Sequence, residues 1–179
     1  MPFRNKVHGS RLRVAIIGAG PAGLGAAIEF ARLPFVDWTL YEQATEIREI
    51  GAGISIQPNT WRLLEVMGAA GNLKPADFYR SADHHSVQHR NGRTGELLVS
   101  HHQKGIPENR LHARTHRSKL QLALLKEVDQ SRVRLSSRLV KVQQQASGKL
   151  LLEFQDGFMD EVDLLVGADG VRSVSIVML

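Results

Sequence analysis

Residues 14–25 read VAIIGAGPAGLG, an apolar run that leads directly into three spaced glycines. The run predicts a β-strand, and the apolar residues beyond the glycines have the periodicity of a helix. In the spacing Gly18-x-Gly20-x-x-Gly23, the first glycine permits a tight turn and the second lets backbone approach phosphates. The third lets the helix pack closely on the strand, so that the helix amides and dipole face negative charge. This order of strand, turn and helix predicts the pyrophosphate-binding part of a dinucleotide-binding unit.

A carboxylate stands at the end of the next predicted strand, residues 38–41. Glu42 follows Gly23 by about 20 residues, the spacing at which such units place an acid that accepts hydrogen bonds from the adenosine ribose. The alternative is an ordinary solvated glutamate at a strand end. An acid here disfavours a 2′-phosphate, so FAD or NAD fits the site better than NADP.

A second glycine turn, Gly51-Ala52-Gly53, precedes an alternating segment that ends at Pro58. Two glycine turns predict a long ligand that approaches backbone at two points, whereas the alternative is a plain turn between elements. Asn59 is predicted to cap a helix over residues 60–67.

Near the other end, the apolar residues 162–166 predict a buried parallel strand. Its carboxyl end presents Asp169 and Gly170, where open α/β sheets bind ligands. The remaining pattern predicts a helix that Arg117 opens, a short strand and two hairpins; in chain order these are the hairpin 84–102, the helix 117–128, the strand 133–135 and the hairpin 139–155.

The composition suits one domain with a real core, since 42% of the 179 residues are hydrophobic. No apolar run approaches the roughly 20 residues of a membrane span, so we expect no stable membrane insertion. The absence of cysteine excludes disulfides and thiolate sites. The net charge of +5 is scattered along the chain, which favours a mild attraction for anionic cofactors over nucleic-acid binding.

Five histidines lie in or beside the predicted hairpin: His84, His85, His89, His101 and His102. A metal site is one interpretation, but adjacent histidines point to opposite faces of a strand and no helical pair with a carboxylate accompanies them. We therefore expect solvated histidines and no metal site. The first thirteen residues are basic and lack the apolar core of a secretory signal. A mitochondrial presequence ending before Val14 is the alternative to the cytoplasmic protein that we expect.

With these pieces in order, the chain resembles the group A flavoprotein aromatic hydroxylases, the salicylate- and 4-hydroxybenzoate-hydroxylase-like FAD monooxygenases. The matching motifs cover nearly the whole chain: GAGPAGL at 18–24, YEQ at 41–43, REIGAGISIQPN at 48–59, HRSKLQ at 116–121 and DLLVGADGVRS at 163–173. The resemblance implies a Rossmann-like, glutathione-reductase-like α/β fold with the start of an inserted antiparallel substrate region at about residues 84–110. Residues 1–179 then form a single FAD-binding domain.

The resemblance also implies roles for single residues. Gly18, Gly20 and Gly23 would hold the FAD pyrophosphate, and Glu42 the adenosine ribose. Ala52 and Gly53 would line the flavin side, and the Arg117 guanidinium would reach the ribityl–pyrophosphate region. The pair Asp169-Gly170 corresponds to a motif linked to both FAD and the reduced nicotinamide.

The implied reaction is that of an oxidoreductase in which NADH or NADPH reduces FAD, and O₂ then serves to hydroxylate an aromatic or related small molecule. Family members are much longer, so we expect this chain to be a truncated, N-terminal portion, and no catalytic residue can be assigned. One alternative is an incomplete FAD-binding module, inactive alone or completed by a partner chain. The other is an NAD-dependent dehydrogenase, which requires neither Arg117 nor the Asp169-Gly170 pair.

Overall fold

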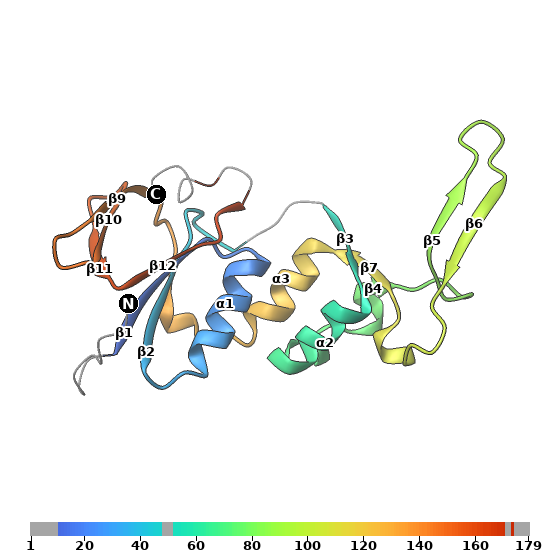
Figure 1. The fold of residues 1–179 in the computed structure, drawn as a ribbon, viewed down its shortest axis with the longest axis horizontal. Coiled ribbons are helices and arrows are strands. Elements are labelled where there is room, and N and C mark those ends of the chain that lie inside the picture. The colour runs from blue at the N-terminus through green and yellow to red at the C-terminus, as the bar shows by residue number, and fades with distance from the viewer. Residues whose placement is uncertain (1–10, 48–51, 171–172, 174–179) are drawn as a thin grey trace, which may run out of the picture. The chain divides into compact units, whose positions relative to one another are not determined.

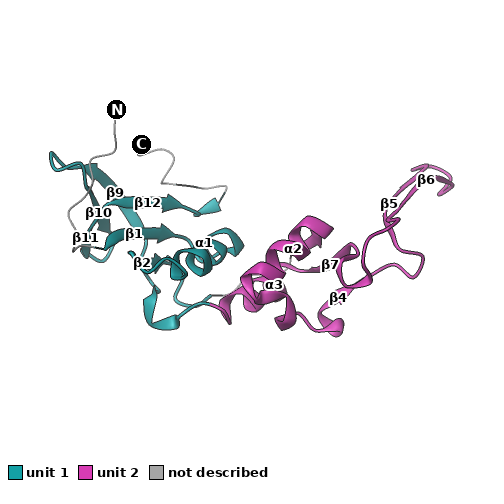
Figure 2. Ribbon diagram, turned by 60° about the horizontal axis from the view of Figure 1, so that its bottom comes forward, with its two compact units in different colours: residues 1–47, 128–179 teal, residues 48–127 magenta. Residues whose placement is uncertain are grey.

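The computed structural model describes residues 11–47, 52–170 and 173. Within it the chain divides into two compact units, coloured separately in Figure 2. Unit 1 comprises residues 1–47 and 128–179, and unit 2 comprises residues 48–127. Unit 1 is therefore assembled from both ends of the chain, while unit 2 is continuous in sequence.

The centre of unit 1 is a parallel sheet in the order β12-β1-β2-β8 (Figure 1). The helix α1 (Pro21–Ala31) connects the first two strands and buries Leu24, Ala27 and Ile28. The α/β fold predicted from the glycine motif is thus confirmed. The strands are β1 (Leu12–Ile17), β2 (Val36–Tyr41), β8 (Val133–Arg134) and β12 (Leu164–Gly167).

An antiparallel sheet completes unit 1, with the strand order β11-β10-β9. The predicted hairpin over 139–155 is confirmed, because β9 and β10 pair antiparallel. One apolar cluster joins both sheets, because Ile17 and Tyr41 pack with Leu152 and Phe154. The strands are β9 (Leu139–Gln144), β10 (Leu150–Phe154) and β11 (Met159–Val162).

The predicted parallel strand over 162–166 is confirmed in part: β12 pairs in parallel with β1, but the strand does not run continuously from Val162. Val162 ends β11, the segment breaks at Asp163, and β12 begins at Leu164. The break has a physical cause, because the Asp163 amide donates to the Arg13 carbonyl at 2.9 Å and its carboxylate accepts the Arg13 amide at 2.9 Å. The new strand is also not buried. It lies at an edge of the described sheet, where Leu164 is 40% exposed.

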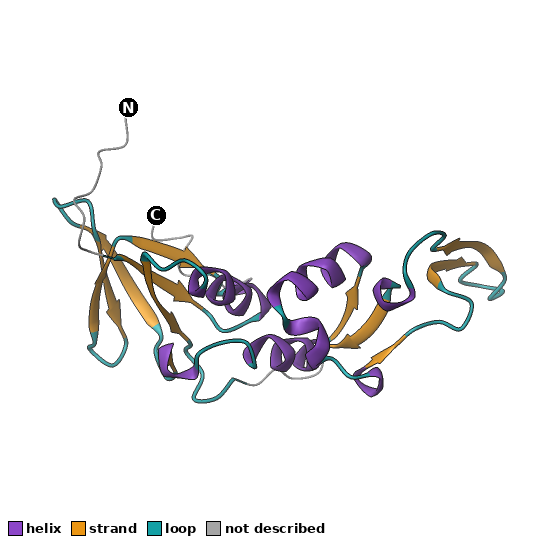
Figure 3. Ribbon diagram, turned by 90° about the horizontal axis from the view of Figure 1, so that it is seen from below, coloured by secondary structure: helices purple, strands orange, loops and turns teal. Residues whose placement is uncertain are grey.

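Unit 2 contains a small antiparallel sheet in the order β3-β7-β4 and two helices, drawn in purple in Figure 3. Its apolar core includes Ile56, Trp61, Ala113 and Leu124. The elements are β3 (Gly53–Ile56), α2 (Pro58–Met67), β4 (Phe78–Tyr79), β7 (Ala113–His116) and α3 (Arg117–Leu125). Short 3₁₀ helices lie at Ala69–Asn72, Pro75–Asp77 and Glu108–Arg110, and in unit 1 at Gln130–Arg132.

Two details of the predicted helices need correction. Helix α2 begins at Pro58 with Gln57 as its N-cap, so Asn59 is not the cap. Proline suits a first helical position, because its fixed φ matches the helix and its missing N–H would have no partner there. The buried side of α2 carries Trp61 and Leu64, whereas Leu63 is 56% exposed. The other helix, α3, ends at Leu125 rather than near 128.

The predicted hairpin over 84–102 is confirmed as β5 (His85–Arg90) paired with β6 (Leu97–His102). Its turn is held by Asn91, whose side-chain oxygen accepts the amides of Arg93 and Thr94. No cluster of three or more potential metal ligands occurs among the described residues. In the same part of the chain, none of the helices has the length and apolar character needed to cross a membrane.

Candidate functional site

The glycine loop between β1 and α1 is held by backbone contacts on two sides. The Gly18 amide donates to the Tyr41 carbonyl at 2.8 Å, and the Ala168 amide donates to the Ile17 carbonyl at 2.8 Å. Gly18 has a φ of +102°, and a Cβ there would lie 2.6 Å from the Ala168 carbonyl oxygen. A Cβ on Gly23 would lie 1.9 Å from the Gly18 carbonyl oxygen. Both positions therefore require glycine for the protein's own packing.

The amino end of α1 presents amides toward the same loop. Gly20 is the N-cap, Pro21 supplies no amide, and the Leu24 amide makes the first helical hydrogen bond, to the Gly20 carbonyl. The amides of Ala22 and Gly23 thus precede the helical hydrogen-bond ladder. Within the described residues no side chain caps this helix, and its first turn carries no acid. Such a helix end attracts an anion.

Glu42 lies against the glycine loop. One carboxylate oxygen accepts the Ala19 amide at 2.7 Å, and the other accepts the Ala44 amide at 2.9 Å. Its backbone is fixed as well, through the Arg134 carbonyl and the Ser137 amide. Each carboxylate oxygen has a second lone pair, so both can accept a further hydrogen bond from a hydroxyl group.

The predicted pair Asp169-Gly170 lies beside the same loop. The Asp169 Cα is 3.0 Å from the position that a Cβ on Gly18 would take. Gly170 has a φ of +75°, and its carbonyl accepts the Ser173 amide at 3.1 Å. Unit 1 therefore brings together all six of its predicted site residues: Gly18, Gly20, Gly23, Glu42, Asp169 and Gly170.

The other three predicted residues gather within unit 2. Arg117 begins α3, and its amide donates to the Ala52 carbonyl at 2.8 Å. Gly53 pairs with His116 in the β3–β7 register, and no atom lies within 4 Å of where its Cβ would be. Ala52, Gly53 and Arg117 are all exposed. Gly51, the first glycine of that predicted turn, lies outside the described residues.

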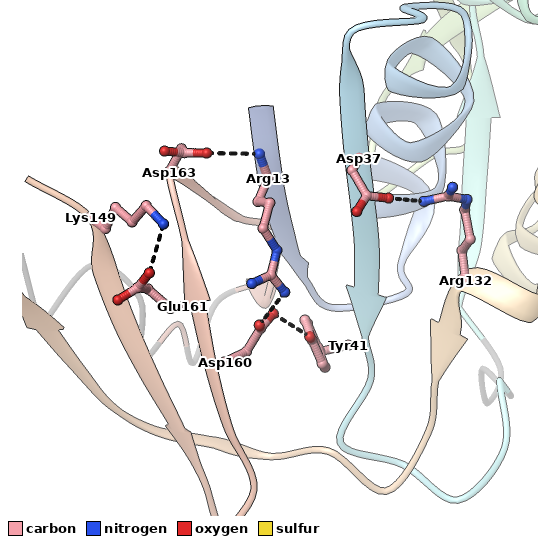
Figure 4. A network of polar contacts seen from close by, with 8 residues as sticks. All are labelled: Arg13, Asp37, Tyr41, Arg132, Lys149, Asp160, Glu161 and Asp163. Carbon is pink, nitrogen blue, oxygen red and sulfur yellow. Dashed lines mark hydrogen bonds and ion pairs between the residues drawn. The ribbon is translucent and has the colours of Figure 1, made fainter. Parts of the chain in front are cut away.

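The sequence did not predict a buried polar contact of Tyr41 (Figure 4), the residue whose carbonyl accepts the Gly18 amide. The Tyr41 hydroxyl donates to one oxygen of Asp160 at 2.7 Å, and the Arg13 guanidinium donates to the other at 2.6 Å. Burial raises the pKa of Tyr41 above its ordinary value, and Asp160 raises that pKa further. The available signal was the strand pattern itself, since Asp160 is an acid at an inward position between exposed Met159 and Glu161.

The other ion pairs in Figure 4 lie at the surface of unit 1. Arg132 donates to Asp37 at 2.6 Å and to the Trp38 carbonyl at 2.9 Å, and Lys149 donates to Glu161 at 2.7 Å. Exposed pairs of this kind contribute little to stability, because water screens both partners.

Residues 11–177 match the family model described as FAD binding domain. The chain therefore belongs to the FAD-binding-domain family. Among curated proteins it is similar to the 3-amino-4-hydroxybenzoate 2-monooxygenase PtmB3 of Streptomyces platensis, with 33% identity over 93% of this chain and 41% of the relative. It is also similar to the salicylate hydroxylase of Pseudomonas putida, with 30% identity over 90% of this chain and 37% of the relative.

The chain is also similar to solved structures over about nine tenths of its length. The tetrameric form of 2-methyl-3-hydroxypyridine-5-carboxylic acid oxygenase has a TM-score of 0.72 and 29% identity, covering 92% of this chain and 41% of that one. A variant of HpxO from Klebsiella pneumoniae, complexed with FAD, has a TM-score of 0.73 and 25% identity, covering 91% of this chain and 41% of that one. The chain thus spans about two fifths of the length of these relatives.

Proposed function

We propose that the chain is the FAD-binding part of an NAD(P)H-dependent flavoprotein monooxygenase that hydroxylates an aromatic or related small molecule with O₂. Membership of the FAD-binding-domain family supports the cofactor. The relatives named as a monooxygenase of an aminohydroxybenzoate and as a salicylate hydroxylase support the reaction. An NAD-dependent dehydrogenase finds no support in these comparisons.

The single observation that carries the proposal is the position of the Glu42 carboxylate against the glycine loop. One end of a dinucleotide offers a ribose diol, which donates hydrogen bonds, and its middle offers a pyrophosphate, which accepts them. Glu42 has free lone pairs for the first, and the first amides of α1 suit the second. The residues present therefore fit FAD, and the Glu42 charge opposes a 2′-phosphate.

Bound FAD would supply hydride acceptance from the nicotinamide and activation of O₂. The chain's own residues would bind and orient it. In our proposal Gly18, Gly20 and Gly23 carry the loop that approaches the pyrophosphate, Glu42 accepts the ribose hydroxyls, and Asp169-Gly170 borders the loop. Arg117 would bring its guanidinium to the ribityl–pyrophosphate region, and Ala52 and Gly53 would line the flavin side. No residue is assigned to the chemical step.

The test is FAD binding to the purified chain, measured by quenching of flavin fluorescence. We expect Glu42→Gln to weaken binding by roughly ten- to a hundred-fold, because one charge-assisted contact is lost. Glu29→Gln is the matched control, since Glu29 is an exposed acid on α1. A wild-type chain that bound NAD tightly and FAD not at all would overturn the proposal.

The length of the chain supports a second candidate function, an FAD-binding module that does not catalyse alone. Relatives are more than twice as long, and a partner chain could supply the remainder. Anaerobic mixing with NADH or NADPH separates the two candidates. Bleaching of bound flavin, followed by a hydroxylated product from a phenolic acid in air, supports the enzyme. Flavin that binds but is not reduced supports the module.

We also propose a cytoplasmic location, where reduced nicotinamide is supplied, and cell fractionation tests it.

A further inference from the structure

Tyr41 joins the glycine loop to a buried acid through two different groups. Its backbone carbonyl accepts the Gly18 amide at 2.8 Å, and its side-chain hydroxyl donates to Asp160 at 2.7 Å. The residue after it is Glu42, whose carboxylate accepts the Ala19 amide. A shift of Tyr41 would therefore move two groups of the proposed cofactor site together, the Gly18 turn and the Glu42 carboxylate.

Asp160 is itself held in place. It lies on β11, is 8% exposed, and is paired across the sheet with Leu152 on β10. Arg13 on β1 donates to its second oxygen at 2.6 Å. Because a buried carboxylate is costly unless it is hydrogen-bonded, Asp160 strongly favours the arrangement in which Arg13 and Tyr41 both reach it.

The contacts close a ring through three strands, as Figure 4 shows in part. Arg13 lies on β1, the strand that leads into Gly18, and binds Asp160 on β11. Asp160 binds Tyr41 at the end of β2, and Tyr41 returns to Gly18. This geometry fixes the end of β2 relative to the end of β1, which is the place where the proposed site is built.

The aromatic part of Tyr41 has separate partners. Its ring lies 4.5 Å from that of Phe154 and 6.4 Å from that of Phe158, measured between centroids. A phenylalanine at position 41 would keep this packing and lose only the contacts of the hydroxyl, which are with Asp160 and Thr39. The packing role and the hydrogen-bonding role of Tyr41 can therefore be tested apart.

We propose that Tyr41 and Asp160 are positioning residues for the dinucleotide, which hold Gly18 and Glu42 in the geometry that binds it. The inference rests on the proposed function, because the ligand is the FAD of that function. It adds that the affinity for FAD depends on a contact that does not touch FAD. A purely structural contact would instead lower stability and leave the affinity of the folded protein unchanged.

The experiment measures the FAD dissociation constant and the urea midpoint of the same variants. For Tyr41→Phe we expect an approximately five- to ten-fold weaker affinity while the protein remains folded at the assay temperature. Asp160→Ala is expected to weaken affinity further, and Asp160→Asn to restore part of it, because the amide oxygen still accepts from Tyr41. The double variant Tyr41→Phe/Asp160→Asn should lose less binding free energy for FAD than the losses of the two single variants added together, since the residues act as one unit.

The matched control is Glu161→Gln, which removes the charge of the exposed neighbour of Asp160 on the same strand. This variant should leave the affinity for FAD unchanged. Hydrogen exchange of the Gly18 amide is a readout independent of FAD, and we expect it to be faster in Tyr41→Phe. Variants that bind FAD as tightly as wild type overturn this inference alone. A wild-type chain that binds no FAD overturns the proposed function.

Discussion

At Gly18 the backbone turns through a φ of +102°, which non-glycine residues rarely adopt, and the Ala168 carbonyl oxygen fills the space where a side chain would begin. Two penalties therefore coincide at one residue. Gly148 has only the first of them, since its φ is +84° but no atom lies within 4 Å of its would-be Cβ. The two positions separate backbone strain from steric overlap.

We predict that Gly148→Ala costs about 1 kcal/mol of unfolding free energy, the usual price of a left-handed alanine. Gly18→Ala should cost more, because the loop must also move away from Ala168. Urea denaturation gives both values, and FAD binding should fail only in Gly18→Ala. Equal losses of stability in the two variants would contradict the steric argument.

His112 makes unit 2 sensitive to acid. It is buried, and burial lowers the pKa of its imidazole, with the Arg114 and His85 charges lowering it further. A lowered folded pKa means that the unfolded chain takes up the proton first. Stability is thus full above the ordinary value of about 6.5 and is lost as pH falls through the folded pKa. We expect His112→Gln to flatten this loss in urea unfolding between about pH 7.5 and 5.5, whereas exposed His101→Gln should not.

Tyr41 gives unit 1 the opposite sensitivity. Its pKa is raised by burial and by Asp160, so the folded protein retains the proton at a pH at which the unfolded chain loses it. Stability is present below the ordinary tyrosine value of about 10 and falls as pH rises beyond it. Tyr41→Phe should remove this alkaline loss. Tyr79→Phe is the control, because Tyr79 is 61% exposed. An unchanged alkaline profile in Tyr41→Phe would contradict the assignment.

Among the elements, those predicted well from sequence have local causes. Helix α1 follows from its glycines and apolar periodicity, and the hairpin β5–β6 from an Asn91-centred turn. The strand break at Asp163 could not be predicted in this way. It depends on a backbone partner, Arg13, that is 150 residues away in sequence. The first turn of α2 differs from the prediction for a local reason, since a proline such as Pro58 suits the end of a strand as well as the start of a helix.

The junction between β11 and β12 can be tested as an element. Asp163→Ala removes the carboxylate that accepts the Arg13 amide at 2.9 Å. We expect a loss of roughly 1 kcal/mol in unfolding free energy. We also expect faster hydrogen exchange at Ala168, whose amide bonds to β1 just beyond β12. Asp163→Asn keeps an acceptor oxygen and should lose less. If the β12 amides kept full protection from hydrogen exchange in Asp163→Ala, the Asp163 side chain would not determine where β12 begins.

For the molecule as a whole, the chain order of the motifs predicted the family, while side-chain contacts between distant segments could not be predicted. The glycine spacing and Glu42 identify one end of the proposed site from residues within a single short stretch. The Tyr41–Asp160 contact joins residues 119 apart, and nothing near either of them in sequence indicates the other. The same holds for Ala168, whose carbonyl explains why Gly18 cannot carry a side chain.

The chain has two tryptophans, and each unit buries one of them. Trp38 lies in unit 1 and Trp61 in unit 2, both nearly inaccessible. In Trp61→Phe the remaining Trp38 reports on unit 1, and in Trp38→Phe the remaining Trp61 reports on unit 2. We predict that the two variants give different urea midpoints. Acid should shift the Trp61 signal through His112, and alkali the Trp38 signal through Tyr41. Coincident transitions at every pH would show that the two units unfold as one.

The discontinuous make-up of unit 1 has a consequence for synthesis on the ribosome. Strand β1 leaves the exit tunnel early, yet its parallel neighbour β12 pairs Leu164 with Val14 and is translated 150 residues later. Every residue of unit 2 is made between these two strands. Unit 2 can therefore acquire its structure while β1, α1 and β2 still await their last neighbour. A nascent chain stalled before residue 164 should protect unit 2 from protease and leave the glycine loop open to cleavage.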